Sequence, residues 1–247
     1  EYVLGSTIAA IGTALITQTF GFLSGFIGYY RRKLIDYRLA SRIILVSVPI
    51  AIAGALAAGV VHDSVLIASY ALLVAVLSIV MWRNQPPATA AAVAMKDAGW
   101  RTVVDSKGHT FAYQSPRLGT GSNLLTATGA FLTGMVSVGI GEVTISQLTR
   151  KGMPIAVAAA TSVLVVITTV VFASTTLVAQ MVKSGGWAAV PWNLLCYDIP
   201  GVLIGGQIGP RLQGRVSPHT MRRAISVLFV LLSVAMMSVA LRKLGVV

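Results

Sequence analysis

The stretch Gly134-Met135-Val136-Ser137-Val138-Gly139-Ile140-Gly141-Glu142 interrupts an apolar segment that covers residues 124–148. Each of its three glycines weakens a helix interior by about 1 kcal/mol relative to alanine. Arg150 and Lys151 follow the segment and a basic loop precedes it, so the charges place both of its ends on one side of a membrane. We therefore predict a re-entrant hairpin that is broken between Val136 and Glu142.

The rest of the chain is as apolar as this segment. Hydrophobic residues make up 55% of its 247 residues and charged residues 11%, whereas a soluble domain has about 25% charged residues. So few charges cannot cover a surface that faces water, and we predict an all-α polytopic membrane protein. A helix needs about 20 apolar residues to cross the bilayer core, and the segments that qualify are 3–29, 43–61, 65–82, 124–148, 154–182, 188–210 and 224–241.

The net charge of +12 is concentrated in three loops. Loops 30–42, 83–122 and 211–223 are rich in Lys and Arg, whereas the turns 62–64 and 183–187 are poor in them. In a soluble protein such a charge would suggest a nucleic-acid partner. Between apolar segments it sets orientation instead, so we predict that the three basic loops are cytoplasmic and that no nucleic acid binds.

Within loop 83–122, two β-prone runs flank a turn rich in Asp, Ser and Gly. They run from Arg101 to Val104 and from His109 to Tyr113. This pattern predicts a small β-hairpin. We interpret it as a structural cap on the cytoplasmic side rather than as a regulatory site.

The two halves of the chain share a weak register at an offset of about 155 residues. Thr13 aligns with Thr168 and Gly54 with Gly209. Matched loops of the two halves differ in positive charge, which predicts inverted structural repeats with a substrate site near the midplane between them. We predict a first repeat of three transmembrane helices in 1–82, a cytoplasmic loop in 83–122, and a second repeat in 123–247. The second repeat contains the re-entrant segment and three transmembrane helices. Its counterpart in the first repeat would precede residue 1 and is expected to be missing from this sequence.

An anion site in such a protein has to be built without deep positive side chains, because no Lys or Arg lies within an apolar segment. Broken helices offer free N–H groups and the positive end of a helix dipole, and hydroxyls add further donors. The predicted substrate-binding residues are Ser6, Thr7, Ser137, Gly139, Gly141, Thr161 and Ser162. The alternative interpretation is that these small residues only let transmembrane helices pack closely.

Two acids in apolar segments are candidates for proton coupling, Glu142 and Asp198. An ionisable group inside the membrane is costly, which favours a functional role. Alternatively, Glu142 caps the second half-helix and Asp198 is a hydrogen-bonded structural acid. The single cysteine, Cys196, excludes a cysteine cluster, and we predict neither a metal site nor a cofactor.

An enzyme is not predicted. An intramembrane hydrolase needs a nucleophile and a base at membrane depth, but His62, His109 and His219 all fall in loops. The expected partners are the lipid bilayer and a small anionic substrate, and a homodimer is left open.

The second half of the chain resembles the TauE/SafE family of sulfite and organosulfonate exporters. The resemblance is carried by the stretch 134–142, by Ala158-Ala159-Ala160-Thr161-Ser162-Val163 and by Gly205-Gly206-Gln207-Ile208-Gly209-Pro210-Arg211-Leu212. It implies export of a small sulfur-containing anion, such as sulfite, sulfoacetate or a related organosulfonate, across a bacterial cell membrane. Glu142 stands where many family members have another glycine. An anion channel, or a carrier of a different small carboxylate or inorganic anion, is the alternative.

Overall fold

The computed structural model describes residues 7–83, 100–106, 108–212, 227–228, 230–235 and 237–238. The elements in chain order are α1 (Thr7–Arg31), α2 (Tyr37–Ala58), α3 (Asp63–Arg83), β1 (Trp100–Val104), β2 (Thr110–Gln114), α4 (Thr120–Val136), α5 (Ile140–Arg150), α6 (Ile155–Gly185), the 3-10 turn Trp187–Ala189 and α7 (Trp192–Leu212). Residues 227–228, 230–235 and 237–238 are helical as well, and the Ser233 hydroxyl donates to the Ala71 carbonyl of α3 at 2.9 Å.

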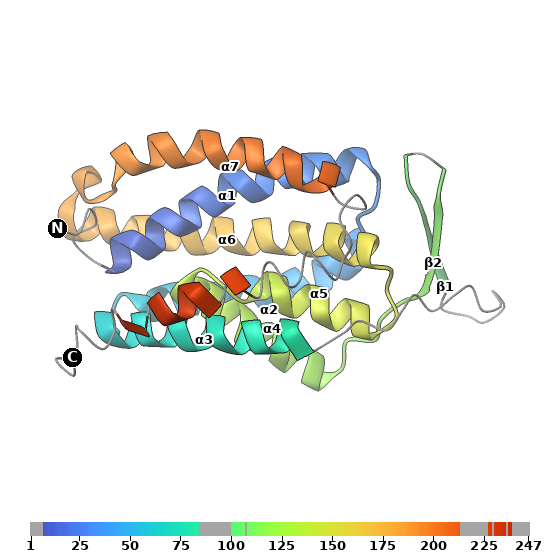
Figure 1. Cartoon of the computed structure of the whole chain (residues 1–247), viewed down its shortest axis with the longest axis horizontal. Coiled ribbons are helices and arrows are strands. Elements are labelled where there is room, and N and C mark those ends of the chain that lie inside the picture. Colours follow the sequence, from blue (N-terminus) through green and yellow to red (C-terminus); the bar gives the residue numbers. More distant parts are fainter. Residues whose placement is uncertain are drawn as a thin grey trace.

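The helix α6 is the central element of the bundle. It packs against α1, α2, α4 and α5, and Figure 1 shows it between one layer formed by α1 and α7 and another that holds α2, α3 and α4. Three described helices, α1, α2 and α6, are long and apolar enough to cross a membrane. The mostly helical architecture with membrane-spanning helices therefore agrees with the predicted fold class.

Polar side chains inside this apolar bundle are paired across helices. Ser47 of α2 and Thr169 of α6 share a hydroxyl–hydroxyl hydrogen bond of 2.8 Å, and Gln180 of α6 donates to the Ala55 carbonyl of α2 at 3.0 Å. Without water, such groups need protein partners. The pairs therefore fix how α2 and α6 lie against each other.

The helices α2 and α4 touch through their backbones. A Cβ atom added at Gly134 would lie 2.0 Å from the Ala51 carbonyl oxygen, and one added at Gly54 would lie 2.2 Å from the Phe131 carbonyl oxygen. Small residues on both helices thus allow a close approach that is common between membrane helices. This contact fixes the position of α4 near its C-terminal end.

The strands β1 and β2 form the antiparallel hairpin that the sequence predicts, in a register that pairs Trp100 with Gln114 and Val104 with Thr110. Figure 1 shows the hairpin standing across one end of the helix bundle. The relation of 1–82 to 123–247 as inverted repeats stays a prediction.

Candidate functional site

The most unusual backbone in the described chain lies between α4 and α5. The helix α4 ends at Val136 and α5 begins at Ile140. Between them, Ser137 has φ +70° and Gly139 has φ +140°. The value at Gly139 is one that side-chain-bearing residues rarely adopt, so glycine is required there. The break falls inside the interval from Val136 to Glu142 that the sequence predicts.

The two half-helices form a hairpin whose ends are tied together at its base. Ser122 near the start of α4 donates to the Gln147 side-chain oxygen at 2.8 Å, and Gln147 Nε2 donates to the Ser122 carbonyl at 3.2 Å. Lys151 donates to the Ser122 hydroxyl at 2.9 Å and to the Arg117 carbonyl. The chain therefore returns after the break to where α4 began. That this hairpin enters and leaves a bilayer on one side stays a prediction.

Two side chains hold the break in place. Thr133 Oγ1 accepts the N–H of Ile140 at 2.8 Å and donates to the Gly129 carbonyl at 2.8 Å, which caps the first amide of α5. Gln18 in the middle of α1 donates to the Ser137 carbonyl at 2.8 Å. The carbonyl and the amide on either side of the turn are thus both satisfied.

The Ser137 hydroxyl, in contrast, has no hydrogen-bond partner although the residue is only 5% exposed. The hydroxyls of Thr17 in α1 and Thr144 in α5 are unpartnered in the same way. Other helical threonines donate to a carbonyl one turn earlier, as Thr13 does to Ala9 at 2.7 Å. An unmet buried hydroxyl costs about 1–3 kcal/mol. These three groups are therefore available to a small polar ligand.

The start of α5 adds backbone donors beside Ser137. The first helical bond of α5 runs from the Val143 N–H to the Gly139 carbonyl at 3.0 Å, so the amides of Gly141 and Glu142 precede the helical ladder and have no intrahelical acceptor. Glu142 lies in this first turn, where a carboxylate is favoured by the helix dipole. Its side chain is half-buried.

The remaining predicted residues lie outside the turn between α4 and α5. Ser6 falls outside the described residues, and Thr7 is the first residue of α1. Thr161 is buried near the start of α6, where its hydroxyl accepts the Asp36 backbone N–H at 3.1 Å. Ser162 donates to the Ala159 carbonyl one turn earlier at 3.0 Å. Both hydroxyls thus have protein partners, and their part in the substrate site stays a prediction.

Asp198 lies on the exposed surface of α7. The helix α7 continues through Pro200 and Gly201, which follow Asp198. Among the described residues, no group of three His, Cys, Asp or Glu residues could hold a metal ion.

The sequence did not reveal a buried polar cluster at the end of the bundle below the β-hairpin. Arg101 Nη1 of β1 donates to both carboxylate oxygens of Asp36, at 2.9 and 3.0 Å, and the Tyr113 hydroxyl of β2 donates to Asp36 at 2.9 Å. Asp36 also caps α2 by accepting the Leu39 N–H at 3.0 Å. Burial, followed by the hydrogen bond to Asp36, raises the pKa of the Tyr113 phenol above its ordinary value. The available signal was Asp36 itself, since Asp immediately before an apolar run is a helix N-cap signature.

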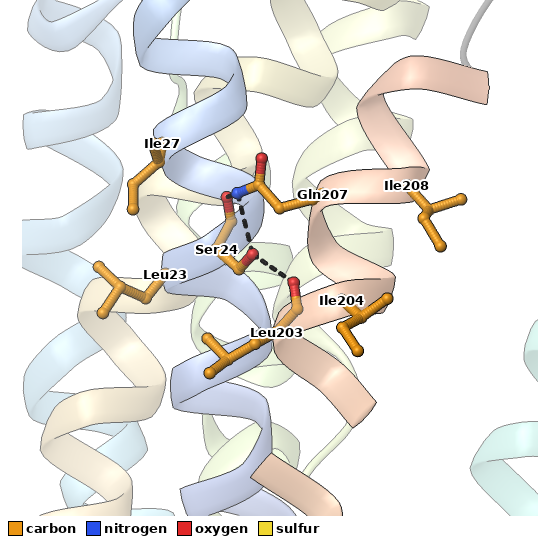
Figure 2. A pocket seen from close by; sticks show the side chains of 7 residues that line it. All are labelled: Leu23, Ser24, Ile27, Leu203, Ile204, Gln207 and Ile208. Atoms are coloured by element: carbon orange, nitrogen blue, oxygen red, sulfur yellow. Dashed lines mark hydrogen bonds between the residues drawn. The ribbon is translucent and has the colours of Figure 1, made fainter. Parts of the chain in front are cut away.

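An open groove of about 500 Å³ lies between α1 and α7 (Figure 2). Its lining is mostly aliphatic, from Leu23, Ile27, Leu203, Ile204 and Ile208. Its two polar side chains satisfy each other, because Gln207 Nε2 donates to the Ser24 carbonyl at 2.8 Å and to its hydroxyl at 3.0 Å. The groove therefore offers a poor environment for an anion, and Gln207 joins the two helices as interhelical glue.

The comparison with known families agrees with the apolar, mostly helical chain. The model of the family described as "Sulfite exporter TauE/SafE" matches residues 2–236. The chain belongs to the TauE/SafE family. Its members are transporters of the sulfite exporter type, which makes this chain a multi-pass membrane transporter and confirms the resemblance drawn from 134–142. No curated protein and no solved structure matches the chain.

Proposed function

We propose that this TauE/SafE member exports a small sulfur-containing anion from the cytoplasm and binds it at the break between α4 and α5. The observation that carries the proposal is the unpartnered Ser137 hydroxyl, which is buried directly before the N-terminus of α5. A hydroxyl donor and free helix amides at one place form a site for a small oxyanion.

The surroundings of Ser137 favour a singly charged or partly shielded anion over a strongly charged one. The positive charge available at the break comes from amides and the helix dipole, which amounts to roughly half a charge. The carboxylate of Glu142 lies in the same turn. Two like charges about 4 Å apart repel by about 4 kcal/mol at an effective dielectric of 20. An ionised Glu142 would therefore oppose the anion. Either it is protonated when the anion is bound, which would link export to protons, or it points away and caps the backbone.

The membrane potential supports export as the direction. A cytoplasm at negative potential drives an anion outward with about 2.3 kcal/mol per charge per 100 mV. The oxygens of sulfite and of organosulfonates match the donors at the break. The electrical drive acts on the net charge that crosses, so a proton that crossed together with a singly charged anion would cancel it.

Thermal stabilisation of the purified protein in detergent tests the ligand class. A ligand that binds only the folded state raises the midpoint by mass action. We expect sulfite or a small sulfonate to stabilise the protein more than small carboxylates of the same charge. Stabilisation by carboxylates alone would assign the protein to a different anion. Saturable counterflow in proteoliposomes would then separate a carrier from a channel.

Substitution of Ser137 tests the location of the site. Ser137→Gly removes the hydroxyl and tolerates φ +70°, so a loss of affinity cannot be ascribed to backbone strain. Losing one hydrogen bond to a charged group costs about 1.5–3 kcal/mol, or roughly 10- to 150-fold in affinity. Ser69→Ala is the matched control, because its hydroxyl donates to the Leu66 carbonyl at 2.8 Å within α3. Equal affinity of wild type and Ser137→Gly would place the site elsewhere.

A further inference from the structure

Three distant parts of the chain meet below the β-hairpin. The turn between α1 and α2 contributes Asp36, whose backbone N–H donates to Thr161 near the start of α6 at 3.1 Å. The Asp36 carboxylate receives Arg101 and Tyr113 from the two strands, at 2.9 Å each for the shortest contacts. The hairpin thus sits on the seam where the α1–α2 turn touches α6.

A second contact fastens the tip of the hairpin to the same turn. The Ser106 N–H donates to the Arg32 carbonyl at 3.1 Å. Asp36 is 6% exposed and Tyr113 is 1% exposed, so the strands cover the seam completely at this point. The side chain of Arg101 is 29% exposed and reaches water on its outer face.

The chemistry of these contacts suits a reversible closure. A buried ion pair adds little net stability compared with apolar residues of the same size, because both charges lose their hydration. Arg101 is near water and can be rehydrated when the pair opens. The hairpin also packs Val103 and Phe111 against the apolar core of the bundle. Its polar contacts with the α1–α2 turn are hydrogen bonds and one ion pair, and these can exchange with water when the hairpin lifts.

We propose that the β1–β2 hairpin is the latch of a gate: its contacts with Asp36 and Arg32 hold the α1–α2 turn against α6 and release when the transport site opens to that side. The basic loops place this side in the cytoplasm. Alternating access requires helices to separate at one end of the transporter and then at the other. The proposal rests on the transport activity of the family and not on the anion site at Ser137.

A reversible covalent lock tests the latch. Arg32→Cys together with Ser106→Cys, in a Cys196→Ser background, places two cysteines at residues whose backbones share a hydrogen bond of 3.1 Å. The control pair is Thr102→Cys with Ala112→Cys, which are cross-strand partners within the hairpin. Its disulfide staples the hairpin without tying it to the bundle.

Transport is measured as the flux of an anion that stabilises the wild-type protein, in proteoliposomes under oxidising and then reducing conditions. Gel mobility or mass spectrometry confirms each disulfide. We expect oxidation of the Arg32–Ser106 pair to slow transport at least tenfold and reduction to restore it, with the control pair unaffected. Equal transport by the oxidised and reduced lock would overturn the latch, even if Ser137 proves to be the binding site.

Accessibility of the seam gives a second measurement that needs no substrate. Ile35 is 6% exposed beside Asp36, so Ile35→Cys in the Cys196→Ser background reports on opening through its reaction with an impermeant thiol reagent. Adding Arg101→Gln should raise the labelling rate several-fold from the side that carries the basic loops. Arg38→Gln, at an exposed arginine of the same turn region, should leave it unchanged. An unchanged rate in a folded Arg101→Gln variant would contradict the latch.

Discussion

The contact between Gly134 and α2 predicts a large effect of a single methyl group. In Gly134→Ala the new Cβ would lie 2.0 Å from the Ala51 carbonyl oxygen and 2.8 Å from the Ala55 nitrogen, whereas real Cβ atoms essentially never come closer than 3.0 Å to another heavy atom. The atoms in the way belong to backbone, which cannot rotate aside. The helix α4 therefore has to move away from α2 by at least 1 Å, roughly the difference between the two distances.

The energy of this displacement can be bounded. Overpacking a well-packed interior costs about 1–3 kcal/mol, and a backbone clash belongs at the upper end of that range. Replacing glycine by alanine within a helix returns about 1 kcal/mol. The net loss is about 2 kcal/mol, which corresponds to a fall in the thermal midpoint of about 4–8 °C for a chain of this size. Ser137 follows α4 directly, so affinity for the anion should fall as well.

Thermal unfolding in detergent, followed by tryptophan fluorescence, measures the effect. Gly121→Ala is the matched control, because Gly121 lies in the same helix and a Cβ added there meets nothing within 4 Å. We expect the control to be as stable as wild type or slightly more stable. If Gly134→Ala unfolds at the temperature of the control, the close approach of α2 and α4 is wrong and with it the placement of the break.

Three further outcomes are expected. Gly139→Ala forces alanine to φ +140° with its Cβ 2.8 Å from a carbonyl oxygen, at a cost of about 1–3 kcal/mol. It should therefore unfold earlier than Gly121→Ala, whose surroundings are open; equal midpoints would contradict the strained turn. In Glu142→Gln the side-chain amide cannot exchange a proton, so the variant should still bind the anion and lose the pH dependence of transport. An unchanged pH profile in a folded variant would mean that Glu142 is only a helix cap. Burial raises the pKa of the Tyr113 phenol in the folded state above 10.0, the ordinary value that it has in the unfolded chain. The stability that the neutral phenol contributes is therefore fully present below about pH 10. It is lost as the pH rises through the higher folded-state pKa. Absorbance titration of wild type against Tyr113→Phe should show one tyrosine ionising late; a difference centred at pH 10 would argue against burial below the hairpin.

Elements that depend on local sequence were predictable. The helices follow from apolar length, the hairpin of Trp100–Val104 and Thr110–Gln114 from β-prone residues around a turn, and the break before Ile140 from three glycines in nine residues. In each case the residues themselves restrict the backbone, so no knowledge of the neighbouring helices was needed.

The contacts between distant segments were not predictable in this way. Asp36 and Arg101 were both read as loop charges that set orientation, because a sequence pattern does not tell which loops meet. Thr161 was assigned to the anion site from its spacing to the start of a helix, and its hydroxyl accepts the Asp36 amide instead. Its place in the substrate site stays a prediction.

The short arms of the α4–α5 hairpin bear on how the protein is made. The arms have 17 and 11 residues, or about 26 and 17 Å at 1.5 Å per residue, and both are shorter than a bilayer core of about 30 Å. We therefore expect that neither arm is inserted alone as an ordinary span. Because α6 is synthesised later, we predict that the hairpin enters the membrane only when α6 has emerged beside α2. A chain truncated before residue 155 should leave Val136→Cys, in the Cys196→Ser background, open to a water-soluble thiol reagent, whereas the full chain should protect it. Protection in both chains would show that the hairpin reaches its place without α6.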